Sequence, residues 1–275
     1  MSNRLSGKVA IVTGAAGGIG KSIAQEFVAE GASVIVADTK IKFGKATIRD
    51  TKRKYKGCNV EFLQSNVSQL SDIKKLVDFS ITKFGKIDLI VNNAAWTEEA
   101  SAVELSESKW DKTLDVSLKS VYLMAKFAIP KMKNGGSIIN ISSVNGIVTN
   151  PGFAAYSAAK AGMLGLTRNL ALEYAHNSIR VNAICPGMIA TEAFLKLINK
   201  YPQEKWGAKE VQPLPYWGRP EDVARTAIFL ASDDSRFMTG ATLVLDGGLT
   251  IQSAEAIVRP WFRKRWRQGK VELKR

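Results

Sequence analysis

A tyrosine and a lysine in the middle of this chain have a spacing that suits proton transfer. Residues 156 to 160 read YSAAK, and positions i and i+4 share one face of a helix, so Tyr156 and Lys160 would lie side by side. A nearby cation favours phenolate, which would lower the pKa of a tyrosine from about 10 toward neutrality. The same spacing occurs at Tyr122/Lys126 and Tyr201/Lys205. A cofactor site and a polarising partner therefore have to distinguish one pair from the others.

A glycine-rich segment near the N-terminus supplies the candidate cofactor site. It reads TGAAGGIG at 13–20, after an apolar run and before a helical pattern. Gly14 permits a tight turn, Gly18 lets the backbone approach a pyrophosphate, and Gly20 lets the helix pack closely on the strand. The helix N-terminus at Ile19 offers free N–H groups and the positive end of the helix dipole to phosphate. This order of elements predicts a dinucleotide site.

Asp38 stands about twenty residues beyond that turn, at the end of the apolar run VIVAD. A carboxylate there accepts a hydrogen bond from a ribose 2′-hydroxyl and repels a 2′-phosphate, so it favours NAD over NADP. Lys40 lies two residues away and would soften that preference. The alternative is that Asp38 is a turn or cap residue.

The elements that must position these residues alternate regularly along the chain. Strands are predicted at 8–12, 33–37, 86–91, 137–140, 178–184 and 241–246, and helices at 18–30, 41–56, 69–84, 107–133, 154–175 and 220–231. Continuous apolar strands separated by helices predict an α/β fold with a parallel sheet covered on both faces. The connection at 188–217 is long enough to be a lid or substrate loop; a partly ordered surface insertion is the alternative.

The composition fits one large domain with no membrane span. The chain has 275 residues, 45 % of them hydrophobic, and no run of about 18 apolar residues. Cys58 and Cys185 have no metal-ligand spacing, so we expect a cytoplasmic protein without a metal site. The single histidine, His176, falls between a helix and a strand, and we interpret it as a solvated loop residue.

A formal charge of +14 could indicate nucleic-acid binding. Half of this charge lies in the last seventeen residues, however, and this uneven distribution weakens that interpretation. This tail carries eight basic residues and one acidic residue, with Trp261, Phe262 and Trp266 among them. It could pack on a neighbouring subunit, bind an acidic partner, single-stranded nucleic acid or an anionic membrane, or be disordered. We expect no stable nucleic-acid or membrane partner, although the tail leaves this open.

Six ordered motifs resemble the single-domain type of the short-chain dehydrogenase/reductase family. They are TGAAGGIG, VNNAA at 91–95, NISS at 140–143, YSAAK, CPGMIAT at 185–191, and GRPEDVA with TGATLVLDGG near the end. The resemblance implies a doubly wound Rossmann domain over 1–249 with a nicotinamide cofactor across the carboxyl ends of the strands. Residues 250–275 would form an extension. Small residues in AAYSAAKAGMLGL, which form a subunit interface in the resembling enzymes, lead us to expect a homotetramer or homodimer.

The resemblance also implies roles for individual residues. Ser143 would hydrogen-bond the substrate oxygen, Tyr156 would exchange the proton, and Lys160 would lower the tyrosine pKa and hold the nicotinamide ribose. Further cofactor contacts are implied for Asn93, Ala94 and Ala95 at the ribose and diphosphate, for Asn66 and Val67 at the adenine, and, after the bend at Pro186 and Gly187, for Ile189 and Thr191 at the nicotinamide amide and phosphate.

Three positions depart from the family pattern. Ser117 stands where many members carry an asparagine that holds a water in the proton relay, so the relay would run through a displaced water or be slower. Asn66 replaces a frequent aspartate, and its carbonyl can still accept from the adenine amino group. NNAAW replaces NNAG, so Ala95 adds a methyl beside the cofactor and Trp96 reaches toward the substrate cleft, unless it is a core residue.

The expected function is NAD-dependent interconversion of a secondary alcohol and a ketone. The cleft would be lined by Trp96, Ser143, Asn145, Phe153, Tyr156, Met188 and the loop that begins near residue 190. Such a mixed lining suits a cyclic or aromatic alcohol, a sugar or a hydroxyacyl thioester. A 3-oxoacyl thioester reductase is one alternative, although the positions that would dock an acidic carrier hold Asn134 and Asn177. A noncatalytic nucleotide sensor or nucleic-acid binder that uses the tail is the other.

Overall fold

Seven parallel strands form one sheet in the computed structural model, which describes residues 3–201 and 211–253. The strands are β1 (Val9–Thr13), β2 (Ser33–Asp38), β3 (Val60–Gln64), β4 (Leu89–Asn92), β5 (Gly136–Ile141), β6 (Ile179–Pro186) and β7 (Thr242–Leu245). Their order is β3-β2-β1-β4-β5-β6-β7, so the direction of winding reverses between β1 and β4. This confirms the predicted doubly wound Rossmann sheet. In such sheets, ligands bind beyond the carboxyl ends of the strands where the order reverses.

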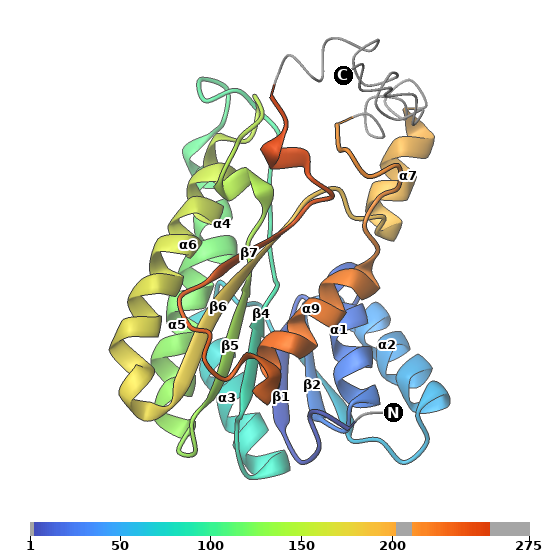
Figure 1. The fold of residues 1–275 in the computed structure, drawn as a ribbon, viewed down its shortest axis with the longest axis vertical. Coiled ribbons are helices and arrows are strands. Elements are labelled where there is room, and N and C mark those ends of the chain that lie inside the picture. Colours follow the sequence, from blue (N-terminus) through green and yellow to red (C-terminus); the bar gives the residue numbers. More distant parts are fainter. Residues whose placement is uncertain (1–2, 202–210, 254–275) are drawn as a thin grey trace, which may run out of the picture.

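Helices cover both faces of the sheet (Figure 1). Their bounds are α1 (Gly18–Ala29), α2 (Ile41–Lys54), α3 (Leu70–Phe84), α4 (Glu107–Leu114), α5 (Ser120–Ala128), α6 (Ala154–Tyr174), α7 (Glu192–Lys200) and α9 (Pro220–Ala231). Val12 of β1 belongs to the core that contains Phe27 of α1, whereas its neighbour Ile11 belongs to the core that contains Met124 of α5. The sheet thus separates two hydrophobic cores. Burying a large apolar side chain such as Phe27 in one of them contributes about 1.5–3 kcal/mol to the stability of the fold.

Three segments differ from the sequence prediction. β3 was not predicted, because it is an edge strand in which only Val60 is buried and the continuous apolar run of the other strands is missing. The predicted helix 107–133 is divided by a π-helical turn at Asp115–Lys119 and ends in a 3-10 turn at Ile129–Lys131. α7 lies inside the predicted loop 188–217, of which 202–210 are outside the described residues. The basic, aromatic part of the predicted extension, from residue 254 on, is also outside them.

Within the described ranges, no helix combines the length and the apolar character needed to cross a membrane. His176 is exposed in a short 3-10 turn, as predicted.

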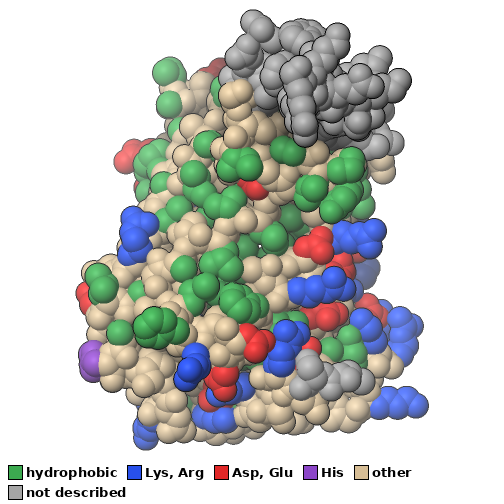
Figure 2. Space-filling model, viewed as in Figure 1, with side chains coloured by type: hydrophobic (Ala, Val, Ile, Leu, Met, Phe, Trp, Pro, Cys, Tyr) green, Lys and Arg blue, Asp and Glu red, His purple; other side chains and the backbone are tan. Residues whose placement is uncertain are grey.

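Hydrophobic side chains gather on the face of the molecule on which β7 lies (Figure 2). β7 is the edge of the sheet, and Val244 in it is 45 % exposed. Phe237, just before β7, is fully exposed, and Leu172 of α6 is 81 % exposed.

Candidate active site

The carboxyl ends of β1, β4, β5 and β6 meet at one edge of the sheet, and the predicted site residues follow these strands. The register pairs Val12 of β1 with Val91 of β4, and Asn92 with Asn140 of β5. Ile141 at the end of β5 pairs in turn with Ile184 of β6. The segments that begin at Gly14, Asn93, Ser143 and Gly187 therefore start side by side, although they are far apart in the sequence.

The glycine-rich turn forms a tight cradle against the segment after β4. Gly14 has a φ of +63°, and a Cβ there would lie 2.8 Å from Cα of Ala94. Asn93 Nδ2 donates to the carbonyl oxygens of Thr13 (3.0 Å) and Gly14 (2.9 Å). Among the described residues, no side chain caps the N-terminus of α1 at Gly17, so backbone N–H groups at this end of the helix remain available. This arrangement fits the diphosphate of a dinucleotide.

Asp38 is held beside this cradle by two backbone N–H groups. Its Oδ2 accepts from the backbone N–H of Ala16 (2.9 Å) and its Oδ1 accepts from that of Lys40 (2.9 Å). A carboxylate has about four lone-pair sites, so each oxygen can still accept another hydrogen bond, as a ribose hydroxyl would require. The turn role and the cofactor role of Asp38 are thus compatible.

The other predicted cofactor residues have more varied surroundings. Asn66 Oδ1 accepts from the backbone N–H and the hydroxyl of Ser68, so part of its accepting capacity is used locally. Val67 is buried, and Ala95 is exposed. Thr191 caps α7, with Oγ1 accepting from Phe194 N (3.2 Å), and its Cγ2 lies 3.5 Å from where a Cβ on Gly18 would be.

The bend after β6 is held by packing on β7 and on the segment before α9. Pro186 ends β6, and a Cβ on Gly187 would lie 2.8 Å from Cα of Asp246. Ile189 is buried in the hydrophobic core and bridges Gly218, whose N–H donates to the carbonyl of Met188 (3.0 Å). The nicotinamide contact of Ile189 and the substrate contact of Met188 stay predictions.

Ser143 and Tyr156 meet at the end of β5. Ser143 caps a 3-10 turn at Val144–Gly146, with Oγ accepting from Asn145 N (3.1 Å). Tyr156 lies in the first turn of α6, with its phenol beside the Ser143 side chain. Burial raises the pKa of Tyr156, and the neighbouring Ser143 side chain opposes that rise. The phenol is therefore protonated at neutral pH.

Lys160 is fully buried behind Tyr156. Its Nζ lies 5.5 Å from the centroid of the tyrosine ring and donates to the carbonyl of Ile141 at 2.7 Å. Burial lowers the pKa of Lys160 to about 8. The role of Lys160 in lowering the pKa of Tyr156 stays a prediction; in this structure burial of the phenol raises that pKa, and the ammonium group is directed to a backbone carbonyl.

Burial also separates Tyr156 from the other two tyrosines with the same spacing. Tyr122 is 46 % exposed, and Lys126 Nζ donates to its hydroxyl at 3.4 Å on the helix surface. Tyr201 is 39 % exposed, and Lys205 is outside the described residues. Of the tyrosines at this spacing, Tyr156 has both the serine partner and the desolvated setting.

Of the predicted substrate residues, Phe153 packs directly beside Tyr156, and Trp96 lies in a segment that pairs with Phe153. The ring of Phe153 meets the ring of Tyr156 edge-on, with centroids 6.4 Å apart. Phe153 also forms a bridge with Ala100, in the segment after β4. Trp96 lies in that segment, and its backbone N–H and carbonyl both bond to the hydroxyl of Ser117. Ser117 is fully buried and contacts the loop instead of facing open space.

Two groups of positioning residues were missed by sequence reasoning. The buried Cys185 thiol lies beside Ser142, whose hydroxyl donates to the carbonyl of Lys160 (2.9 Å). Asn140 accepts from Asn92 Nδ2 (2.8 Å) and donates to Thr167 Oγ1 of α6 (2.9 Å), so it ties α6 to the sheet. Polar residues inside otherwise apolar strands were the available signal, because buried polar groups need partners.

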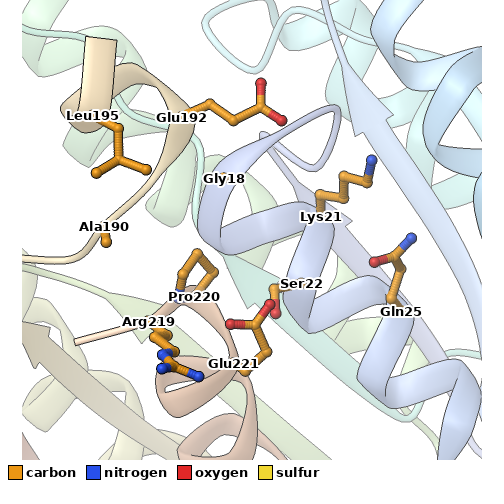
Figure 3. A pocket seen from close by; sticks show the side chains of 10 residues that line it. All are labelled: Gly18, Lys21, Ser22, Gln25, Ala190, Glu192, Leu195, Arg219, Pro220 and Glu221. Atoms are coloured by element: carbon orange, nitrogen blue, oxygen red, sulfur yellow. The ribbon is translucent and has the colours of Figure 1, made fainter. Parts of the chain in front are cut away.

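A cavity of about 430 Å³ lies beside the glycine-rich turn, between α1, α7 and α9 (Figure 3). It is lined by Gly18, Lys21, Ser22, Gln25, Ala190, Glu192, Leu195, Arg219, Pro220 and Glu221. Gly18 is the one predicted site residue in this lining, so the cavity adjoins the glycine-rich turn and not Tyr156.

Comparisons with known proteins agree with this geometry. The chain matches the family model described as Enoyl-(Acyl carrier protein) reductase over residues 14–250. It is 41 % identical over 252 residues to a 3-oxoacyl-(acyl-carrier-protein) reductase of Thermotoga maritima, covering 90 % of this chain and 100 % of that protein. It is 35 % identical over 256 residues to a 7alpha-hydroxysteroid dehydrogenase of Bacteroides fragilis, covering 91 % and 97 %.

Among solved structures, one from Burkholderia xenovorans, described as a short-chain dehydrogenase/reductase, superimposes with a TM-score of 0.87 at 35 % identity. The match covers 91 % of this chain and 99 % of that chain.

Proposed function

Because the chain belongs to the short-chain dehydrogenase/reductase family of oxidoreductases, we propose that it interconverts a ketone and a secondary alcohol, with Tyr156 exchanging the proton. The observation that carries this proposal is the position of the half-buried Tyr156 phenol beside the Ser143 side chain, at the sheet edge where the glycine-rich turn begins. We propose that the substrate is a small cyclic, aromatic or sugar-like molecule, because the aromatic side chain of Phe153 lies beside Tyr156.

Tyr156, Ser143 and Lys160 have different roles in the proposed reaction. A bound nicotinamide cofactor would supply or accept the hydride. In the reducing direction, the Tyr156 hydroxyl donates its proton to the substrate oxygen as that oxygen gains negative charge. The Ser143 hydroxyl donates a hydrogen bond to the same oxygen and stabilises its charge. Lys160 supports α6 and the end of β5 through its bond to Ile141, and its ammonium group lies behind the phenol.

The direction of the pKa shift on Tyr156 leads to a first prediction. Reduction needs the phenol, which a raised pKa preserves at neutral pH, whereas alcohol oxidation needs the phenolate. We expect ketone reduction to be nearly independent of pH between about 6 and 8, and alcohol oxidation to increase with pH above that range. Steady-state assays of both directions on a panel of cyclic, aromatic, sugar and hydroxyacyl compounds would test this. Absence of turnover with every compound and either cofactor would contradict the proposed function.

We also propose that NAD is preferred over NADP, because the carboxylate of Asp38 is held beside the turn by two backbone N–H groups. Asp38→Asn removes the negative charge and keeps the shape of the side chain, so the ratio of NAD to NADP affinity should fall at least about tenfold. Calorimetric titration with both nucleotides measures this ratio. Asp50→Asn, on the nearby α2, is the matched control and should leave it unchanged. An unchanged ratio in Asp38→Asn would contradict the assignment.

A second candidate substrate is a 3-oxoacyl thioester, which is favoured by the 41 % identity to a 3-oxoacyl-(acyl-carrier-protein) reductase. Asn134 and Asn177, at the positions where arginines would dock an acidic carrier, are exposed and uncharged. We therefore expect a free thioester to be reduced with little further gain from attachment to a carrier protein.

We propose that the chain forms a homodimer or homotetramer. Phe237 and Val244 are strongly exposed at β7, which is an edge strand among the described residues, and Leu172 of α6 is exposed as well. Light scattering should give a mass that is an even multiple of the monomer, and Phe237→Asp should increase the share of smaller species. A monomer at micromolar concentration would contradict this proposal.

The division of the chain into a domain that ends at residue 249 and an extension that begins at residue 250 stays a prediction.

A further inference from the structure

The net charge of the chain is concentrated in two short segments. The last seventeen residues contribute a net charge of +7, and residues 40–56, with eight basic residues and one acidic residue, contribute another +7. The remainder of the chain is balanced, with 23 basic and 23 acidic residues. Residues 40–56 contain α2, which lies at an outer edge of the molecule (Figure 1), and Lys and Arg side chains gather at that edge (Figure 2).

The basic side chains of α2 lie along one face of the helix. Helical residues that are three or four positions apart share a face, and five basic residues of α2 follow this spacing: Lys42, Lys45, Arg49, Lys52 and Arg53. All five are exposed, and the side chains of Arg49 and Arg53 are 77 % and 83 % exposed. The opposite face is buried at Gly44, Thr47 and Thr51. We call the five residues the basic stripe.

Ion pairs within the chain compensate little of this charge. Like charges three or four residues apart destabilise a helix, and each member of the basic stripe has such a neighbour. Asp50 Oδ1 lies 3.7 Å from Arg49 Nε and 4.0 Å from Arg53 Nη2, and the same carboxylate also pairs with Lys21 of α1. The three lysines of the stripe form no ion pair with any residue that the structure describes. The stripe therefore keeps its charge available for a partner.

The helix dipole accounts for only one end of the basic stripe. Lys52 and Arg53 lie in the last turn of α2, where cations are stabilising. Lys42 lies in the first turn, which contains no acidic residue, although an acidic residue is the favourable choice there. Stability of the isolated helix thus does not explain why the stripe continues along its whole length.

The length and charge density of the basic stripe match a nucleic-acid strand. From Lys42 to Lys52 the helix rises about 15 Å, at about 1.5 Å per residue. One strand of a B-form duplex carries one phosphate per about 3.4 Å of its axis, so four or five phosphates would lie along this length. That number equals the number of cationic side chains in the stripe to within one. Lys and Arg are the usual partners of phosphate oxygens in such contacts.

Apolar side chains do not interrupt the basic stripe. Of the large apolar residues in α2, Ile41 (42 %) and Phe43 (58 %) are exposed, and both lie in the first turn, at one end of the stripe. A helix that lies on a membrane buries an apolar face in the lipid, and a protein partner needs an apolar or aromatic anchor near the centre of the contact. The middle and the last turn of the stripe offer neither, so its surface suits a partner that is bound through charge.

We propose that the basic stripe of α2 binds the phosphodiester backbone of a nucleic acid, without reading its sequence. The sequence alone led us to expect no stable nucleic-acid partner; the placement of these charges on one exposed face revises that expectation. Each phosphate contact contributes about −0.9 to the slope of log K against log salt for duplex DNA, and about −0.7 for a single strand. This binding does not depend on the proposed ketone reduction.

The main test compares the full-length wild-type chain with the triple variant Lys45→Gln, Arg49→Gln, Lys52→Gln. Fluorescence anisotropy would measure binding to labelled random-sequence RNA, single-stranded DNA and duplex DNA of about 20 nucleotides or base pairs, at about 50 to 200 mM salt. Because three phosphate contacts are lost, affinity at about 100 mM salt should fall at least about tenfold and the slope should become shallower by about two to three. The basic tail is the same in both proteins, so it does not cause a difference between them.

The triple variant Lys74→Gln, Lys75→Gln, Lys83→Gln is the matched control. It removes the same charge from three exposed lysines of one helix, α3, which also carries Asp72 and Asp78 and so has no uninterrupted basic face. Its affinity should stay within about twofold of the wild-type value. An equal loss in the two triple variants would overturn the proposal in favour of a general effect of net charge. Circular dichroism would verify that both variants fold.

A second measurement distinguishes the nucleic acid from an anionic membrane. Cosedimentation with vesicles of phosphatidylserine and phosphatidylcholine would be measured for the wild-type chain and the α2 variant. Vesicle binding that is lost in the α2 variant, together with wild-type binding to none of the nucleic acids, would overturn the proposal in favour of a lipid surface. Equal nucleic-acid affinity of the wild-type chain and the α2 variant would also overturn it. A stronger effect on RNA or on DNA would support the proposal and identify which of the two is bound.

Discussion

Replacing Tyr156 by phenylalanine is expected to lower kcat for ketone reduction by about two to four orders of magnitude, the range that general acid–base catalysis contributes. The hydroxyl is the group that meets Ser143, and it is desolvated, so bulk water is a poor substitute as proton donor. The phenylalanine ring keeps the packing against Phe153. The fold should therefore persist, with the loss of one hydrogen bond costing about 1 kcal/mol of unfolding free energy.

The chain contains a control with the same local sequence pattern. Tyr122 stands four residues before Lys126 and bonds to it, but it is exposed on the surface of α5. Tyr122→Phe should keep wild-type kcat and KM. Initial-rate measurements on both variants, with circular dichroism to verify folding, would show whether turnover depends on the Tyr156 hydroxyl. If Tyr156→Phe retains kcat to within tenfold, another group must supply the proton.

Gly14→Ala is expected to have the second large effect, on both stability and cofactor binding. The backbone at Gly14 has a φ of +63°, and the added Cβ would lie 2.8 Å from Cα of Ala94, which is backbone and cannot rotate away. The left-handed conformation alone costs a residue with a side chain about 1–2 kcal/mol, and relieving the overlap would move the segment after β4 away from the turn. We expect the unfolding free energy to fall by about 2 kcal/mol or more and NAD affinity to fall more than about tenfold.

Gly17 provides the comparison within the same turn. Its φ of −164° is extended backbone, and an added Cβ there would meet no atom within 4 Å. Gly17→Ala should therefore keep the unfolding free energy of the wild-type protein. Urea unfolding and titration with NAD measure the two effects separately. Wild-type stability in Gly14→Ala would mean that the turn is looser than the close approach to Ala94 implies.

The sequence by itself determined the family, the doubly wound α/β fold and the strand–turn–helix setting of the glycine-rich segment. These features depend on local patterns: apolar runs that alternate with helical periodicity, and glycines directly after the first strand. Where the local pattern was weak, the prediction failed. β3 carries polar and half-buried residues because it is an edge strand, and the π-helical turn at Asp115–Lys119 has no signature in hydrophobic periodicity.

Only the tertiary structure decided how the candidate active-site residues interact. The sequence placed Tyr156 beside Lys160, but burial by distant segments sets the direction of their pKa shifts, and the lysine ammonium is directed to the carbonyl of Ile141 in β5. Likewise, Ser117 could be identified as a departure from the family pattern, but its two bonds to Trp96 join positions 21 residues apart. Side-chain desolvation and hydrogen-bond partners come from segments that meet only when the sheet forms, and for that reason local spacing could not reveal them.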